Sequence, residues 1–163
     1  CFIPDGDYAA FIRRYTGRGY PAGPFVNEAG QLLGEHTGII GYTVGQRRGL
    51  GVSSNQGRLY VKEVRPADNT VVLSDNQSLF ARALTARQVN WIACGTPGAP
   101  LHLRAKIRYR MTEQPCTVEQ TGPDQVRVVF DQPQRAVTPG QAVVFYDGDT
   151  VVGGAAIEKG ESL

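Results

Sequence analysis

Tight-turn residues divide the second half of the chain at short intervals. These turns are Pro97-Gly98, Gly122-Pro123-Asp124, Pro139-Gly140 and Asp147-Gly148-Asp149. Short segments between tight turns favour strands over long helices. From about residue 85 onward we therefore expect six strands, at residues 87–93, 101–110, 116–120, 125–131, 141–146 and 150–157.

Six short strands with tight connections favour an antiparallel barrel that is closed or nearly closed. The composition agrees, because the 163 residues include 20 glycines and 10 prolines. A chain of this length can bury a core without disulfides or metals, as one domain or two small ones. We expect the barrel to occupy residues 81–163.

The first part of the chain, residues 1–80, is expected to be a small, loop-rich domain. Residues 7–15 (DYAAFIRRY) predict a short helix with Asp7 as its N-cap, because apolar residues recur there at helical spacing. Two hairpins should follow, turning at Glu28–Gly30 and at Asp68–Asn69. The predicted fold is therefore mainly β.

Residues 101–110 (LHLRAKIRYR) alternate between apolar and basic side chains. Since side chains alternate faces along a strand, the basic ones would line one face over roughly 27 Å, at about 3.3 Å per residue. A stripe of this length can follow a nucleic-acid backbone. It can also be a solvated outer face whose charges pair with carboxylates across the strand. The few acidic residues nearby favour phosphate binding slightly. The residues of the expected stripe are His102, Arg104, Lys106, Arg108 and Arg110.

A second basic segment, GYTVGQRRGLG, places Gln46, Arg47 and Arg48 among four glycines. Glycine lets the backbone approach a ligand closely, and arginine suits phosphate recognition. The spacing matches neither a Walker loop nor a dinucleotide-binding GxGxxG motif. Taken alone, the segment indicates an ordinary turn as readily as a phosphate site.

The three cysteines, Cys1, Cys94 and Cys116, are widely spaced and form no CxxC pair, so no metal site is expected. Their odd number argues against a disulfide framework and favours a reducing compartment. We predict Cys94 and Cys116 to be small core or turn residues. Cys1 would need a nearby positive charge or a helix N-terminus to become a reactive thiolate. Without either, it would be an inert terminal residue.

The formal net charge of +2 means that any nucleic-acid contact must come from local clusters of basic residues. No apolar run approaches the ~18 residues of a membrane-spanning helix. The beginning of the chain also lacks a basic-then-apolar secretion leader. We therefore expect a cytoplasmic protein with no membrane partner.

Four stretches resemble, in order, the bacterial tRNA-specific 2-thiouridylases. They are CFIPDGDYAAFI, GEHTGIIGYTVGQRRGLG, AKIRYR and AVTPGQAVVFYDGDTVVGGAAI, so the resemblance spans nearly the whole chain. Members of this family are ATP-dependent sulfurtransferases that convert the wobble uridine of lysine, glutamate and glutamine tRNAs to 2-thiouridine. The resemblance implies this activity, rather than the methyl transfer of an older family name, since no S-adenosylmethionine-type glycine motif is present.

The resemblance also implies that the chain is a fragment. The family's ATP domain carries an SGGxDSS-type motif that is absent here, so ATP would bind outside this chain and no cofactor is expected within it. The remainder resembles the family's central domain and a barrel similar to the second domain of elongation factors. Such a fragment would supply tRNA binding and one catalytic cysteine, and would be inactive alone.

Site residues are implied by the same resemblance. Cys1 matches the catalytic cysteine that carries sulfur as a persulfide, with its partner cysteine in the absent half. A cysteine desulfurase or a sulfur-relay protein would be the sulfur donor. For Arg47 and Arg48, the resemblance supports functional importance without assigning a contact to either residue. The implied tRNA-binding residues are Arg108, Tyr109, Gln141, Lys106, Arg47 and Arg48.

A different class of function remains open beside the enzyme fragment. The chain could be a stand-alone RNA-binding barrel module without chemistry. An SGGxDS motif upstream of Cys1 would favour the enzyme.

Overall fold

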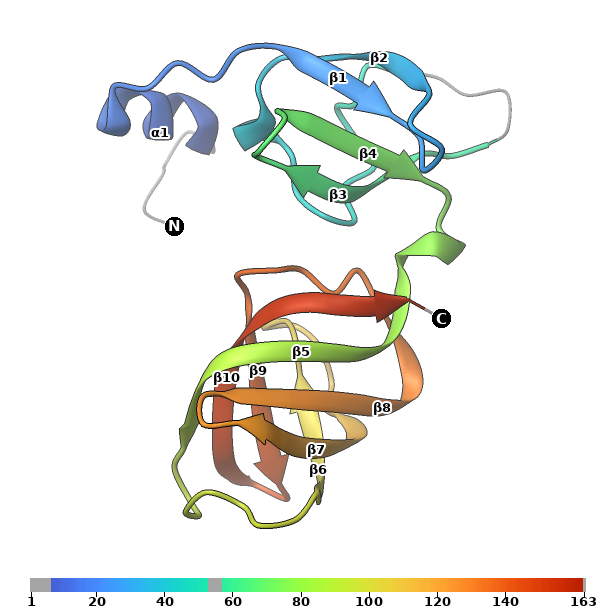
Figure 1. The fold of residues 1–163 in the computed structure, drawn as a ribbon. Coiled ribbons are helices and arrows are strands. Elements are labelled where there is room, and N and C mark those ends of the chain that lie inside the picture. Colours follow the sequence, from blue (N-terminus) through green and yellow to red (C-terminus); the bar gives the residue numbers. More distant parts are fainter. Residues whose placement is uncertain (1–6, 53–56, 163) are drawn as a thin grey trace. The chain divides into compact units, whose positions relative to one another are not determined.

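The computed structural model describes residues 7–52 and 57–162. The chain divides into two compact units, Cys1–Ser78 and Leu79–Leu163. In the described part, Figure 1 shows one α-helix, a small open sheet and a barrel. The prediction of a mainly β fold with a six-stranded antiparallel barrel is confirmed. No helix in the described ranges is long and apolar enough to cross a membrane.

The first unit begins with helix α1 (Tyr8–Thr16), close to its predicted position. The Asp7 carboxylate caps the helix by accepting a backbone N–H of the first turn at 2.8 Å. Gly17 ends the helix in a left-handed conformation, and its N–H donates to the Arg13 carbonyl. No residue of α1 is buried, and the Arg13 guanidinium attaches the helix to the unit by donating to the Thr37 carbonyl.

A four-stranded sheet completes this unit, in the order β2-β1-β4-β3. The predicted hairpins are the pairs β1–β2 and β3–β4, and a parallel pairing of β1 with β4 joins them. Every residue of the central strand β4 is buried. The strands are β1 (Gly23–Val26), β2 (Leu32–His36), β3 (Tyr60–Arg65) and β4 (Thr70–Ser74). Short 3-10 turns lie at η1 (Ile39–Gly41) and η2 (Gln77–Leu79).

His36, at the end of β2, is buried with both ring nitrogens hydrogen-bonded. Nδ1 accepts the Gly38 N–H at 3.2 Å, so Nε2 carries the proton and donates to the Asn69 carbonyl at 2.8 Å. The neutral ring packs edge-on against Phe25. A side chain at Gly23 would collide with this arrangement, since its Cβ would lie 2.8 Å from His36 Nε2. His36 therefore joins the β1–β2 hairpin to the turn between β3 and β4.

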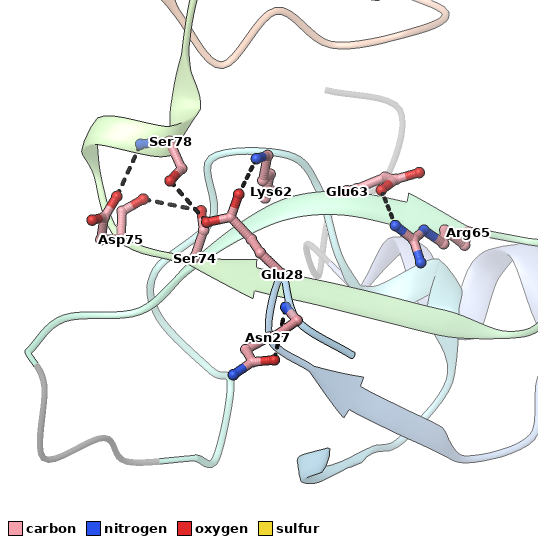
Figure 2. Close-up of polar contacts among 9 residues, drawn as sticks. Asn27, Glu28, Lys62, Glu63, Arg65, Ser74, Asp75 and Ser78 are labelled. Carbon is pink, nitrogen blue, oxygen red and sulfur yellow. Dashed lines mark hydrogen bonds and ion pairs between the residues drawn. The ribbon is translucent and has the colours of Figure 1, made fainter. Parts of the chain in front are cut away.

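Figure 2 shows Glu28, in the turn after β1, between Lys62 of β3 and Ser78. Its carboxylate forms an ion pair with Lys62 and accepts a hydrogen bond from Ser78 Oγ at 2.8 Å. The hydrogen bond from Lys62 holds the pKa of Glu28 below its ordinary value. The Ser78 N–H in turn donates to the Asp75 carboxylate at 2.9 Å. These contacts tie the last residues of the first unit to its sheet.

The second unit is a closed barrel whose neighbouring strands are all antiparallel, in the order β10-β5-β8-β7-β6-β9. Closure pairs every strand on both sides and so leaves no exposed edge. Inward-facing side chains such as Leu84, Phe130 and Phe145 form its core. The strands are β5 (Phe80–Trp91), β6 (Leu101–Lys106), β7 (Gln114–Gly122), β8 (Gln125–Arg135), β9 (Ala142–Asp147) and β10 (Thr150–Ser162).

Two strands start or end far from their predicted limits. β5 begins at Phe80 instead of residue 87, and β10 continues to Ser162 instead of ending at residue 157. These extensions pair with each other, for example Gly160 with Leu84. A pairing between the two ends of a unit leaves little trace in the local sequence pattern.

The prediction of one strand over residues 101–110 is wrong at its C-terminal end. β6 ends at Lys106, because the chain bends there to reach β7 at Gln114. Arg108 and Arg110 therefore do not continue the face of β6, and the expected basic stripe is interrupted after Lys106.

We expect His36→Ala to destabilise the first unit by about 2–4 kcal/mol, because it leaves a cavity beside Phe25 and two unpaired backbone groups. Hydrogen exchange of the β4 amides measures this free energy. Glu35→Ala, at an exposed position of the same strand, is the control and should change it little. Equal protection in both variants would show that the His36 contacts do not stabilise the sheet.

Candidate nucleic-acid interface

A hollow of about 650 Å³ lies on the barrel, around the end of β6 and the strand β9 beside it. We call it the β6–β9 groove. Four of the six residues implied to bind tRNA line it, namely Lys106, Arg108, Tyr109 and Gln141. The other lining residues are Ile107, Ala142, Val144 and Tyr146.

Strand pairing brings these distant parts of the sequence together. Lys106 at the end of β6 pairs with Val144 in the middle of β9. Gln141 directly precedes β9, and its carbonyl accepts the Ile157 N–H of β10 at 2.7 Å. Gly140 makes the preceding turn possible with a φ of 83°, a conformation that favours glycine. The groove therefore depends on the β6–β9 pairing and on a glycine turn.

Tyr109 is the most exposed large apolar side chain among the described residues, with 97% of its surface accessible. It lies in the bend that follows β6. An aromatic ring in this position can stack on an unpaired base, which is how proteins bind single-stranded and looped RNA.

Arg108 holds this bend against the end of β8. Its Nη2 donates to the carbonyls of Arg135 and Ala136, the latter at 2.7 Å. Partial burial, together with the charge of Arg135, lowers the pKa of Arg108, although a guanidinium stays charged at any physiological pH. Arg108 thus fixes the backbone beside Tyr109 and adds positive charge to the groove, and its hydrogen bonds to other described residues use Nη2 alone.

The Lys106 ammonium forms an ion pair with Glu113 at 2.7 Å and lies 5.2 Å from the centre of the Tyr146 ring. The hydrogen bond within the pair raises the pKa of Lys106 and lowers that of Glu113. Nearby, Arg104 donates to the Glu113 carbonyl and His102 bonds the Thr117 hydroxyl. The basic residues of β6 itself are therefore engaged by β7 and the segment that leads into it.

Arg47 and Arg48 belong to the first unit, in the loop between η1 and β3, and both are exposed. Gln46 holds this loop, since its side chain accepts the Thr43 N–H and donates to the Arg48 carbonyl, both at 3.0 Å. Its backbone carbonyl also accepts the Val61 N–H of β3 at 2.9 Å. No salt bridge involves either arginine among the residues that the structure describes. They belong to a different unit from the one that carries the β6–β9 groove.

The predicted persulfide carrier, Cys1, lies outside the described residues. Cys116 is a core residue, which is one of the two predicted alternatives. Burial raises the pKa of its thiol to about 12. Such a thiol is not a nucleophile at neutral pH. Cys94 is exposed in the turn-rich segment between β5 and β6. Within residues 7–52 and 57–162, no group of three His, Cys, Asp or Glu could hold a metal ion.

Sequence reasoning missed two residues of this region. Tyr146 lines the groove, together with the alternate β9 residues Ala142 and Val144. Their alternation is visible in the sequence, but the pairing of β9 with β6 is not. Glu113 pairs with Lys106, and it could have been noticed as the only acidic residue from residue 76 to residue 118.

Two protein-family models match the chain, one in each unit. A tRNA methyl transferase PRC-barrel domain matches residues 9–75. An aminomethyltransferase beta-barrel domain matches residues 81–157. Together the two matches account for most of the chain.

Curated relatives match nearly the whole chain. The tRNA-specific 2-thiouridylases MnmA of Clostridioides difficile, Koribacter versatilis and Acetivibrio thermocellus are 45%, 49% and 47% identical over 159, 162 and 158 residues. These alignments cover 98%, 96% and 97% of this chain but only 44% of each relative, so the chain spans less than half the length of these proteins. The two domain matches and these relatives show that the chain belongs to the tRNA-specific 2-thiouridylase family.

Proposed function

We propose that this chain is the tRNA-binding part of an ATP-dependent sulfurtransferase that converts the wobble uridine of lysine, glutamate and glutamine tRNAs to 2-thiouridine. The observation that carries the proposal is the β6–β9 groove, where four residues implied to contact tRNA surround one hollow. The shared name of the relatives, tRNA-specific 2-thiouridylase, supports the RNA class and the reaction. A tRNA substrate also fits a cytoplasmic location.

The lining of the groove suits an RNA loop better than a duplex. Lys106 and Arg108 supply positive charge for phosphates. Tyr109 offers a ring to an unstacked base, and the Gln141 amide can both donate and accept hydrogen bonds at a base edge. The wobble base lies in a loop, and an enzyme that modifies a base must take it out of its stack. A surface that holds splayed nucleotides therefore fits this substrate.

In this proposal Cys1 carries the sulfur. Adenylation of uridine O2, on a part of the enzyme outside this chain, makes that oxygen a leaving group. The terminal sulfur of the Cys1 persulfide attacks C2 and AMP departs with the oxygen, while a second cysteine outside this chain forms a disulfide with Cys1. After a thiol reductant has cleaved this disulfide, a cysteine desulfurase or sulfur-relay protein transfers a new sulfur to the free Cys1 thiolate. Cys116 is unsuited to this role, because its buried thiol has a pKa of about 12.

Tyr109→Ala should weaken binding of the tRNA anticodon stem-loop by about 1–3 kcal/mol, because a stacked base is lost. Tyr109→Phe keeps the ring and should bind like the unmodified chain. Fluorescence anisotropy with a labelled stem-loop measures both affinities. Tyr109 is a sharper probe than Arg108, because removing Arg108 also releases the backbone at Ala136.

The control for this experiment is Tyr15→Ala, which removes another exposed aromatic side chain, from helix α1. It should leave stem-loop affinity unchanged. If Tyr109→Ala bound the stem-loop as tightly as this control, the groove would not be the RNA site.

Cys1→Ser in the longer enzyme should abolish 2-thiouridine formation and leave tRNA affinity unchanged, because an alcohol cannot carry a persulfide. Mass spectrometry of the digested tRNA measures the modified nucleoside. Cys94→Ser is the matched control and should keep full activity. A Cys1→Ser enzyme that thiolates at the unmodified rate would overturn the catalytic assignment of Cys1.

A further inference from the structure

Glu113 contacts two basic residues of β6, Arg104 and Lys106. Glu113 accepts a hydrogen bond from the Lys106 ammonium at 2.7 Å through its side chain. Its backbone carbonyl accepts another from Arg104 Nη2 at 2.8 Å. Because Arg104 and Lys106 lie on the same strand, β6 holds both the main chain and the side chain of Glu113. The position of the carboxylate is therefore well defined.

This carboxylate reduces the positive charge that the groove presents. Lys106 and Arg108 are the two cationic residues among those lining the groove. The pKa of Lys106 is raised and that of Glu113 is lowered by their hydrogen bond, so both groups are ionised at neutral pH. With Glu113 in place, Arg108 is the lining cation that lacks a carboxylate partner among the described residues.

The fold has little need of this ion pair. The side chains of Lys106 and Glu113 are partly exposed, at 28% and 29%, so water reaches the pair and limits its contribution to stability. The backbone at Glu113 is also held by Arg104, whose bond does not involve the carboxylate. The main consequence of the Glu113 charge therefore falls on the groove.

We propose that Glu113 limits the phosphate-driven part of RNA affinity, by occupying the place at Lys106 that a phosphate oxygen of the bound tRNA would take. This inference rests on the proposed function of the groove. To use Lys106, the RNA must first displace the Glu113 carboxylate, so one anion replaces another and the net electrostatic gain is small. Affinity then depends more on stacking at Tyr109 and on the Gln141 amide, which distinguish a loop from any other polyanion.

Glu113→Gln tests this, because it removes the charge while keeping nearly the same shape and the Arg104 bond. We expect it to tighten binding of the labelled anticodon stem-loop about two- to fivefold at low salt. The slope of log affinity against log salt concentration should become more negative by about one. In a Lys106→Met background, Glu113→Gln should produce neither effect, since the masked charge is gone.

Glu119→Gln is the matched control, because it makes the same change in net charge at an exposed β7 position that does not line the groove. If Glu113→Gln and Glu119→Gln gave the same affinity and salt dependence while Tyr109→Ala still lost binding, the role of Glu113 would be refuted and the proposed function would stand. If Tyr109→Ala bound normally, the RNA groove itself would be refuted, and this inference with it.

Discussion

Barrel closure is the constraint on which the candidate site depends. β5 and β10, which come first and last in the sequence of the second unit, pair from Ala81 with Ser162 to Trp91 with Gly153 and close the barrel. Closure in the order β10-β5-β8-β7-β6-β9 places β9 between β10 and β6. The end of β6 therefore meets β9, although a whole hairpin, β7–β8, separates them in the sequence. Without this closure, Tyr109 and Gln141 would have no reason to share a groove.

The β6–β9 groove offers RNA three kinds of interaction, each modest by itself. They are stacking on Tyr109, hydrogen bonds to the Gln141 amide, and the positive charge of Lys106 and Arg108. Arg108 fixes the bend after β6 to two backbone carbonyls, which keeps Tyr109 on a defined backbone while its ring stays in solvent. Lys106 is charged but partnered by Glu113. The site thus presents one rigidly supported aromatic ring and a reduced positive charge. That balance suits recognition of an RNA loop, where stacking supplies selectivity and phosphate contacts alone would not.

Local patterns predicted most of the fold, because turns, N-caps and strand alternation are encoded in neighbouring residues. The Asp7 cap, both hairpins and all six barrel strands are examples. Features set by pairing between distant residues were missed, including the long β5–β10 pairing, the end of β6 at Lys106 and the place of Tyr146 in the groove. The alternation of basic residues over 101–110 indicated the right region. The predicted basic stripe is wrong beyond Lys106, because the strand ends there, where the candidate site begins.

Hydrogen exchange of the 163-residue chain, with and without unmodified lysine tRNA, tests the central claim most directly. Binding in the β6–β9 groove should slow exchange of the backbone amides at residues 107–113 and 140–146, and should leave β5, which pairs with neither β6 nor β9, largely unchanged. Protection that appears only outside these two segments, with tRNA bound, would contradict the assignment of the groove as the tRNA site.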